Sequence, residues 1–183
     1  MFWTNAVGKD PKRKFRWIFM NNHIPVYTCK KVTKPSWTMD AVEHRYLNHT
    51  FKYPGGIKWE AVTLTLVDPL QPDASATLMS ILEAGGYHPP SDANDTSTMS
   101  KERAVAALGM VEIQQIDSNG ASVEKWTLVN AWVKSAKFGE LDYEADELTE
   151  LELEIEYDYA YMDTQGSAQS PIPGNHFPTN VMG

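Results

Sequence analysis

The feature that most constrains the fold is the run ELELEIEYDY at residues 150–159, in which acidic and non-acidic residues alternate without exception. Its acidic members are Glu150, Glu152, Glu154, Glu156 and Asp158. Successive side chains of a strand point to opposite faces, whereas a helix would scatter these carboxylates around its axis. The run therefore predicts one strand, with five carboxylates on one face and an apolar row on the other.

Strand-like patterns also dominate the rest of the chain. Strands are expected at 14–20 and 24–32, joined by a hairpin turn, at 58–67 after Pro54-Gly55-Gly56, and at 111–116 and 123–133 around Asp117-Ser118-Asn119-Gly120. A helix is expected from Asp73 to Ala84, stopped by Gly85-Gly86, and residues 100–108 fit a short helix or a strand. Residues 37–51 fit a strand or an extended arm. This succession indicates a mainly β fold: two antiparallel sheets packed as a distorted barrel or sandwich, with one flanking α-helix and long loops.

Length and composition fit one main domain followed by a short tail. The chain has 183 residues, 42% of them hydrophobic, and residues 163–183 are rich in Gly, Pro, Ser and Asn. We expect a domain over residues 1–162 with a mobile loop at 88–100, and an extended arm or disordered tail at 163–183. No run is long and apolar enough to predict a membrane anchor, and the single Cys29 cannot form an internal disulfide.

Charge is divided unevenly along the chain. Residues 1–60 hold eleven Lys or Arg against four Asp or Glu, whereas residues 61–183 hold five against twenty. A basic surface that meets an acidic surface of another copy would explain this asymmetry, and nucleic-acid contact is the weaker option because the acidic half repels phosphate. The fold could also interleave the two halves and remove the polarity. The basic segment expected to reach an adjacent subunit contains Lys9, Lys12, Arg13, Lys14 and Arg16.

No pattern of catalysis, metal binding or cofactor binding stands out. The common phosphate-loop, hydrolase and zinc motifs are absent, and the five His residues are scattered. Three interpretations of the acidic row remain open. It could hold a catalytic carboxylate pair, although acid–base work needs one carboxyl group to be desolvated. It could be the solvent face of an antiparallel sheet, or it could face a water-filled lumen where negative charge keeps a polyanion from sticking.

The sequence resembles the tail tube proteins of contractile-tailed bacteriophages. The resemblance runs from about residue 12 to residue 160, through KFRWIF, VYTCKKVTKP and YPGGIKWEAVTLTLVD to VEKWTLVNAWVKSAKFGELDYEADELTELELEIEYDYA. Trp126, the Asn130-Ala131-Trp132 step, the stretch FGELDY at 138–143 and the closing EYDY at 156–159 carry most of its specificity.

The resemblance implies a structural virion protein, without a catalytic site, metal or cofactor, that belongs to the tail tube and is assembled in the host cytoplasm. Its partners would be further copies in hexameric rings stacked head to tail, the tail sheath protein, the baseplate hub or tube initiator, and transiently the tape measure protein and genomic DNA. The joined sheets of such a ring would line a lumen, and the row from Glu150 to Asp158 would face it.

Two alternatives remain from the sequence alone. One is a soluble β-barrel that binds a ligand in a pocket lined by Trp37, Trp59 and Trp132. The other keeps the tube fold but assigns the chain to a baseplate or tail-end paralogue, or to the tube of a phage-like injection particle. Self-association with rising concentration would separate the tube subunit from the binding barrel.

Overall fold

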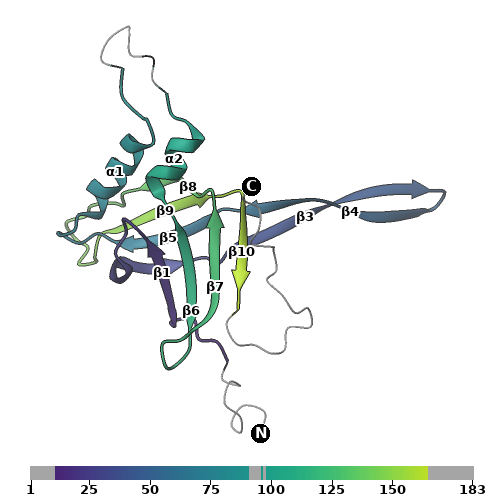
Figure 1. Ribbon diagram of the computed structural model, residues 1–183, viewed down its shortest axis with the longest axis horizontal. Helices are drawn as coiled ribbons and strands as arrows, with labels where there is room; N and C mark the ends of the chain where they lie inside the picture. Colours follow the sequence, from purple (N-terminus) through teal and green to yellow (C-terminus); the bar gives the residue numbers. More distant parts are fainter. Residues whose placement is uncertain (1–10, 91–95, 97, 165–183) are drawn as a thin grey trace, which may run out of the picture.

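A computed structural model describes residues 11–90, 96 and 98–164, which form ten strands, two α-helices and one short 3-10 turn (Figure 1). The elements are β1 (Trp17–Asn21), the turn η1 (Val26–Thr28), β2 (Cys29–Val32), β3 (Ser36–Tyr46), β4 (His49–Glu60), β5 (Val62–Val67), α1 (Ala74–Ala84), α2 (Lys101–Leu108), β6 (Val111–Ile116), β7 (Ser122–Val129), β8 (Trp132–Lys137), β9 (Glu150–Glu156) and β10 (Tyr159–Asp163). The predicted mainly β fold class is confirmed.

Two four-stranded antiparallel sheets enclose the core. Sheet A has the order β1-β6-β7-β10 and sheet B the order β2-β5-β9-β8. The strands of the two sheets run in different directions in Figure 1, as in orthogonally packed sandwiches. The apolar row of the acidic run supplies part of this core, because Leu151, Leu153 and Ile155 are fully buried. They lie beside buried residues of β5, to which β9 pairs in the register Leu64↔Leu153.

The two helices cover one end of this sandwich (Figure 1). Asp73 caps α1 by accepting a hydrogen bond from the backbone N–H of Ala76, and Leu78 and Ile81 turn into the core. The second helix, α2, settles the open choice for residues 100–108. Its cap is Ser100, whose hydroxyl accepts from the N–H of Arg103, and Leu108 is fully buried. The single helix of the expected fold is therefore joined by a second.

β3 and β4 form a long two-stranded ribbon that projects from the body (Figure 1). This element includes residues 37–51, for which the sequence left a strand or an extended arm open, and it is both. The predicted strand 58–67 is divided at Ala61, because β4 belongs to the ribbon and β5 to sheet B.

Three sequence predictions are corrected at places where the chain changes sheet. β1 pairs with β6 and β2 with β5, so residues 14–32 form no hairpin. The hairpin of β6 and β7 is confirmed, but the predicted strand 123–133 is broken by Asn130, whose φ of 54° lies in the left-handed region that Asn tolerates. The strand predicted at 150–159 ends at Glu156, and Tyr159 opens β10 in the other sheet.

Candidate interaction surfaces

Four of the five predicted carboxylates share the outer face of sheet B, where lysines pair with them. Lys134 of β8 lies 3.1 Å from Glu154 and 3.2 Å from Glu156. Lys137 lies 3.4 Å from Glu152, and Lys30 of β2 pairs with Glu150. The hydrogen bond from Lys134 lowers the pKa of Glu154, so that this carboxylate stays ionised.

This pairing changes the electrostatic character expected of the acidic row. The strands of sheet B carry four Glu, all on β9, and four Lys, which are Lys30 and Lys31 of β2 and Lys134 and Lys137 of β8. Their formal charges cancel. Three of the four lysines form ion pairs with the Glu row, Lys134 and Lys137 from the neighbouring β8 and Lys30 from β2 across β5. The sequence had suggested a purely acidic wall here.

Asp158, the fifth member of the predicted row, lies at the corner between β9 and β10. Its carboxylate accepts hydrogen bonds from Lys101 of α2, at 2.6 and 2.8 Å, and from the Asn130 side chain, at 2.7 Å. These hydrogen bonds lower the pKa of Asp158, and the bond from Lys101 has the largest effect. Asp158 thus ties the end of sheet B to α2, and it does not continue the β9 row.

The basic N-terminal segment lies against sheet A of its own chain. Lys12 and Lys34 both pair with Glu124 of β7, Lys34 at 2.7 Å, and the indole N–H of Trp126 also donates to this carboxylate. Burial alone would raise the pKa of Glu124, but these three donors outweigh it and lower the pKa to about 2. Lys34 also donates to the side-chain oxygen of Gln115, at 2.7 Å. Lys9, also predicted for this segment, lies outside the described residues.

Beside this cluster is a hollow of about 570 Å³ that we call the lysine cleft. Its lining includes Lys12, Lys14, Lys30, Lys31 and Lys34, together with the indoles of Trp17 and Trp126. The lysines come from the N-terminal segment, from β2 and from the connection to β3. The cleft therefore combines positive charge with aromatic surface.

The β3–β4 ribbon carries apolar side chains on both of its faces. The register pairs Trp37 with Trp59 and Met39 with Ile57 on one face, and Val42 with Tyr53 and His44 with Phe51 on the other, because side chains alternate along β3. Each face also holds one ion pair, from Lys52 to Glu43 on the first face and from Lys58 to Asp40 on the second. Six of these apolar side chains are at least 43% exposed, namely Trp37, Met39, Val42, Phe51, Tyr53 and Ile57. Exposed apolar clusters on both faces of a projecting ribbon mark surfaces that another molecule covers.

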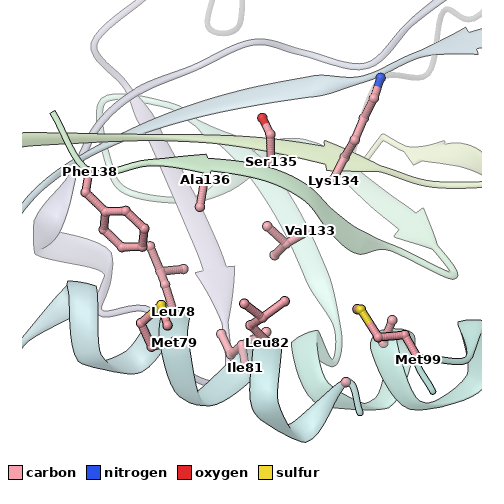
Figure 2. Close-up of a pocket in the computed structure, with 12 residues that line it drawn as sticks. Leu78, Met79, Ile81, Leu82, Met99, Val133, Lys134, Ser135, Ala136 and Phe138 are labelled. Carbon is pink, nitrogen blue, oxygen red and sulfur yellow. The ribbon is translucent and has the colours of Figure 1, made fainter. Parts of the chain in front are cut away.

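A smaller apolar hollow of about 190 Å³ lies between α1 and β8 (Figure 2). Leu78, Ile81 and Leu82 of α1 point toward Val133 and Phe138, and Met99 closes one side. Of the three tryptophans considered for a ligand pocket, Trp132 alone lines one of the hollows described here. Trp132 lines a separate hollow with Met99, Lys101 and Tyr157, and neither Trp37 nor Trp59 belongs to its lining.

The described residues hold no group of three or more His, Cys, Asp or Glu side chains placed to bind a metal ion. Burial raises the pKa of Cys29 to about 11, which leaves its thiol protonated and weakly nucleophilic. Within the same part of the chain, no helix is long and apolar enough to cross a membrane.

Comparison with known proteins identifies the fold. No protein-family model and no curated protein matches the chain. Among solved structures, a chain of the anti-feeding prophage tube-terminating cap aligns with a TM-score of 0.64 and 16% identity, over 87% of this chain and 95% of that one. A chain of the sheath–tube complex of the extracellular contractile injection system PVC aligns with a TM-score of 0.62 and 18% identity, over 84% and 92%.

A chain of the anti-feeding prophage baseplate aligns with a TM-score of 0.60 and 17% identity, over 84% of this chain and 96% of that one. All three matches span nearly the whole of the matched chains, so they concern the complete sandwich and not one sheet. The chain thus has the fold of the tube and cap proteins of contractile injection systems, as the sequence resemblance led us to expect.

Proposed function

We propose that this protein is a structural subunit of the inner tail tube, which it forms as hexameric rings stacked head to tail. The β3–β4 ribbon is the observation that carries the proposal. Among the described residues nothing covers its exposed apolar side chains, and a two-stranded ribbon has no core of its own. A neighbouring copy in a stack would bury these side chains, and such a head-to-tail contact propagates without closing.

The edges of the two sheets support the same proposal. β2 and β8 are the outer strands of sheet B, and β1 and β10 are those of sheet A. Exposed edges invite pairing with further strands, and joining the sheets of six copies into one barrel would remove them. In such a ring the outer face of sheet B, with Glu150, Glu152, Glu154 and Glu156, would line the lumen through which the genome passes. The paired lysines would leave that wall close to neutral.

The remaining partners follow from this assignment. The tail sheath protein would surround the tube, the baseplate hub would start it, and the tape measure protein and DNA would occupy the lumen in turn. The protein would belong to the virion after assembly in the host cytoplasm. A second candidate is the tube of an injection particle without a genome, which is favoured by the source of the matched chains. Isolation of particles that carry this protein and a DNA-filled head would favour the phage tail over the injection particle.

Electron microscopy of the purified protein over a concentration series tests the assembly. We expect rings or stacked tubes with a central hole. A variant with Trp37→Ser and Tyr53→Ser should remain monomeric, because it removes one exposed apolar side chain from each face of the ribbon. A matched control with Thr38→Ser and Lys52→Gln alters one polar side chain on each face and should still assemble. Monomers of the wild-type chain at all concentrations, also with a baseplate present, would refute the proposal.

Labelling of assembled tubes tests the lumen assignment separately. Cysteine introduced by Glu152→Cys should react with a small maleimide but not with a polyethylene-glycol maleimide too large to enter the lumen. Ser80→Cys, on an exposed position of α1, is the control expected to react with both. Equal reaction of Glu152→Cys with the large reagent would place the outer face of sheet B on the outside of the tube.

A further inference from the structure

The connection from β8 to β9 is an acidic loop with uncovered apolar side chains. Residues 138–149 contain five carboxylates and neither Lys nor Arg; these are Glu140, Asp142, Glu144, Asp146 and Glu147. Three apolar residues of the same loop are exposed: Leu141 at 91% and Tyr143 at 110% between the acids, and Leu148 at 73% directly after Glu147. Exposed acids alone would indicate a solvated loop. Exposed acids that share a loop with an exposed tyrosine and two exposed leucines indicate a segment that another surface covers.

The two ends of this acidic loop are fixed by the fold. Gly139 has a φ of 79°, and a Cβ atom there would lie 2.7 Å from the carbonyl oxygen of Glu150, so only glycine fits. The side chain of Asp142 accepts a hydrogen bond of 3.0 Å from the N–H of Glu144, which orders the turn at Tyr143. The carbonyl of Thr149 accepts from the N–H of Asp68 at the other end. The fold therefore fixes where the loop leaves and re-enters the body, and Asp142 orders the turn at Tyr143.

The lysine cleft has the complementary chemistry. Lys12 and Lys34 are engaged with Glu124 and Lys30 with Glu150, but Lys14 and Lys31 form no ion pair with any carboxylate of the described residues. Both are exposed, and both line the cleft together with the indoles of Trp17 and Trp126. The cleft thus offers two available ammonium groups beside aromatic surface, which suits a carboxylate next to a tyrosine or leucine side chain.

The order and direction of strands in sheet B bring these two features together across copies. β8 and β2 are its opposite edges, so continuing the sheet into a neighbour places β8 of one copy beside β2 of the next. The end of β8 and the start of β2 lie at the same end of the sheet. Lys137, the last residue of β8, pairs with Glu152 near the start of β9. Cys29, the first residue of β2, pairs with Leu66 of β5, and Leu66 pairs with Leu151, also near the start of β9. The rotation that relates neighbouring copies in a ring leaves the direction of each strand relative to the ring axis unchanged. In such a ring the loop that leaves β8 would emerge beside the start of β2 of the neighbour, where Lys30 and Lys31 lie.

We propose that the acidic loop of one copy binds in the lysine cleft of the next copy in the ring, with carboxylates at Lys14 and Lys31 and an exposed apolar side chain against the indoles. This contact rests on the proposed ring and names the side chains that hold it together. It also gives the charge division of the sequence a physical role, since the cleft belongs to the basic first third of the chain and the loop to the acidic remainder.

A charge-reversal experiment tests the contact. The loop variant carries Glu140→Lys and Glu144→Lys, and the cleft variant carries Lys14→Glu and Lys31→Glu; all four side chains are exposed. Each variant alone should need a roughly tenfold or higher protein concentration to form rings, because like charges face each other at every interface. An equimolar mixture should assemble like the wild type, since alternating copies restore opposite charges at every contact. The Glu83→Lys variant, altered on α1, is the control.

The mixture decides between a contact across copies and one within a chain. Circular dichroism first establishes that each variant is folded. Rescue by mixing supports the proposal. Rescue only when all four substitutions are placed in one chain would show that the loop reaches the cleft of its own copy and would overturn it. Assembly of both the loop variant and the cleft variant at the wild-type concentration would also overturn the proposal. So would a cleft variant whose sole defect is loss of DNA binding.

A second measurement separates this contact from ring formation itself. A synthetic peptide of residues 138–149 is titrated into the dilute full-length chain, and tryptophan fluorescence reports its binding beside Trp17 and Trp126. We expect saturable binding that weakens with salt and is lost in the cleft variant. Peptide binding without wild-type rings would uphold the contact and refute the hexameric tube. Rings that are indifferent to both charge reversals, together with no peptide binding, would refute the contact and uphold the tube.

Discussion

Replacing Glu124 with Gln removes the charge that holds the N-terminal segment and the connection after β2 against sheet A. The folded pKa of about 2, against an ordinary value of 4.5, corresponds to an upper limit of about 3 kcal/mol. Lys12 and Lys34 remain 49% and 46% exposed, so water screens both partners. We therefore expect the Gln variant to lose about 1–2 kcal/mol of unfolding free energy at pH 7, or roughly 2–8 °C in melting temperature.

The dependence on pH provides the sharper test of this prediction. Because folding lowers the pKa of Glu124, its contribution is complete above about pH 5 and disappears as the pH falls toward 2. The stability difference between wild type and Glu124→Gln, measured by urea denaturation of dilute protein from pH 7 to pH 2.5, should shrink over that interval. The control Glu43→Gln breaks an exposed pair and should cost less than about 0.5 kcal/mol. A difference that stays constant with pH would refute the ionised, paired state of Glu124.

Three further predictions concern the folded subunit. Gly139→Ala should lower the unfolding free energy by about 1–3 kcal/mol, because the added Cβ meets the backbone of Glu150 at a positive φ, and a thermal melt with an unchanged midpoint would contradict this. Leu153→Ala should cost about 2–5 kcal/mol in urea denaturation because Leu153 is fully buried, whereas the exposed Leu148→Ala should be nearly neutral. The thiol of Cys29, with its pKa raised to about 11, should react slowly with a disulfide reagent at pH 8 and quickly in denaturant; equal rates would contradict its burial.

The sequence predicted the elements whose signal is local. The alternation from Glu150 to Tyr157 needs no knowledge of other strands, and the Asp73 cap needs only its own helix. The sequence could not show where the chain changes sheet. The breaks at Ala61, Asn130 and Asp158 lie inside continuous strand-like patterns, and their cause is the packing of two separate sheets.

The electrostatic surfaces were the harder part to predict, because they depend on which strands are neighbours. The acidic row was visible, but its neutralisation requires β8 beside β9, which brings Lys134 to Glu154. The spacing of Lys134 and Lys137 in a predicted strand was the available signal. The lysine cleft could not be anticipated, since its residues come from segments that only the fold brings together.

The position of the ribbon also has a genetic consequence. β3 and β4 pair with each other and with neither main sheet, and their side chains are nearly all exposed. Apart from Trp59, which packs against the core beside Tyr157, substitutions there leave the hydrophobic core untouched, so natural variants of this protein should fall into two separable groups. Those in the sandwich would lower the amount of folded subunit, and could be suppressed by growth at lower temperature. Those in the ribbon would yield normal amounts of a subunit that fails to incorporate, and could be suppressed only by changes on the surface that receives it.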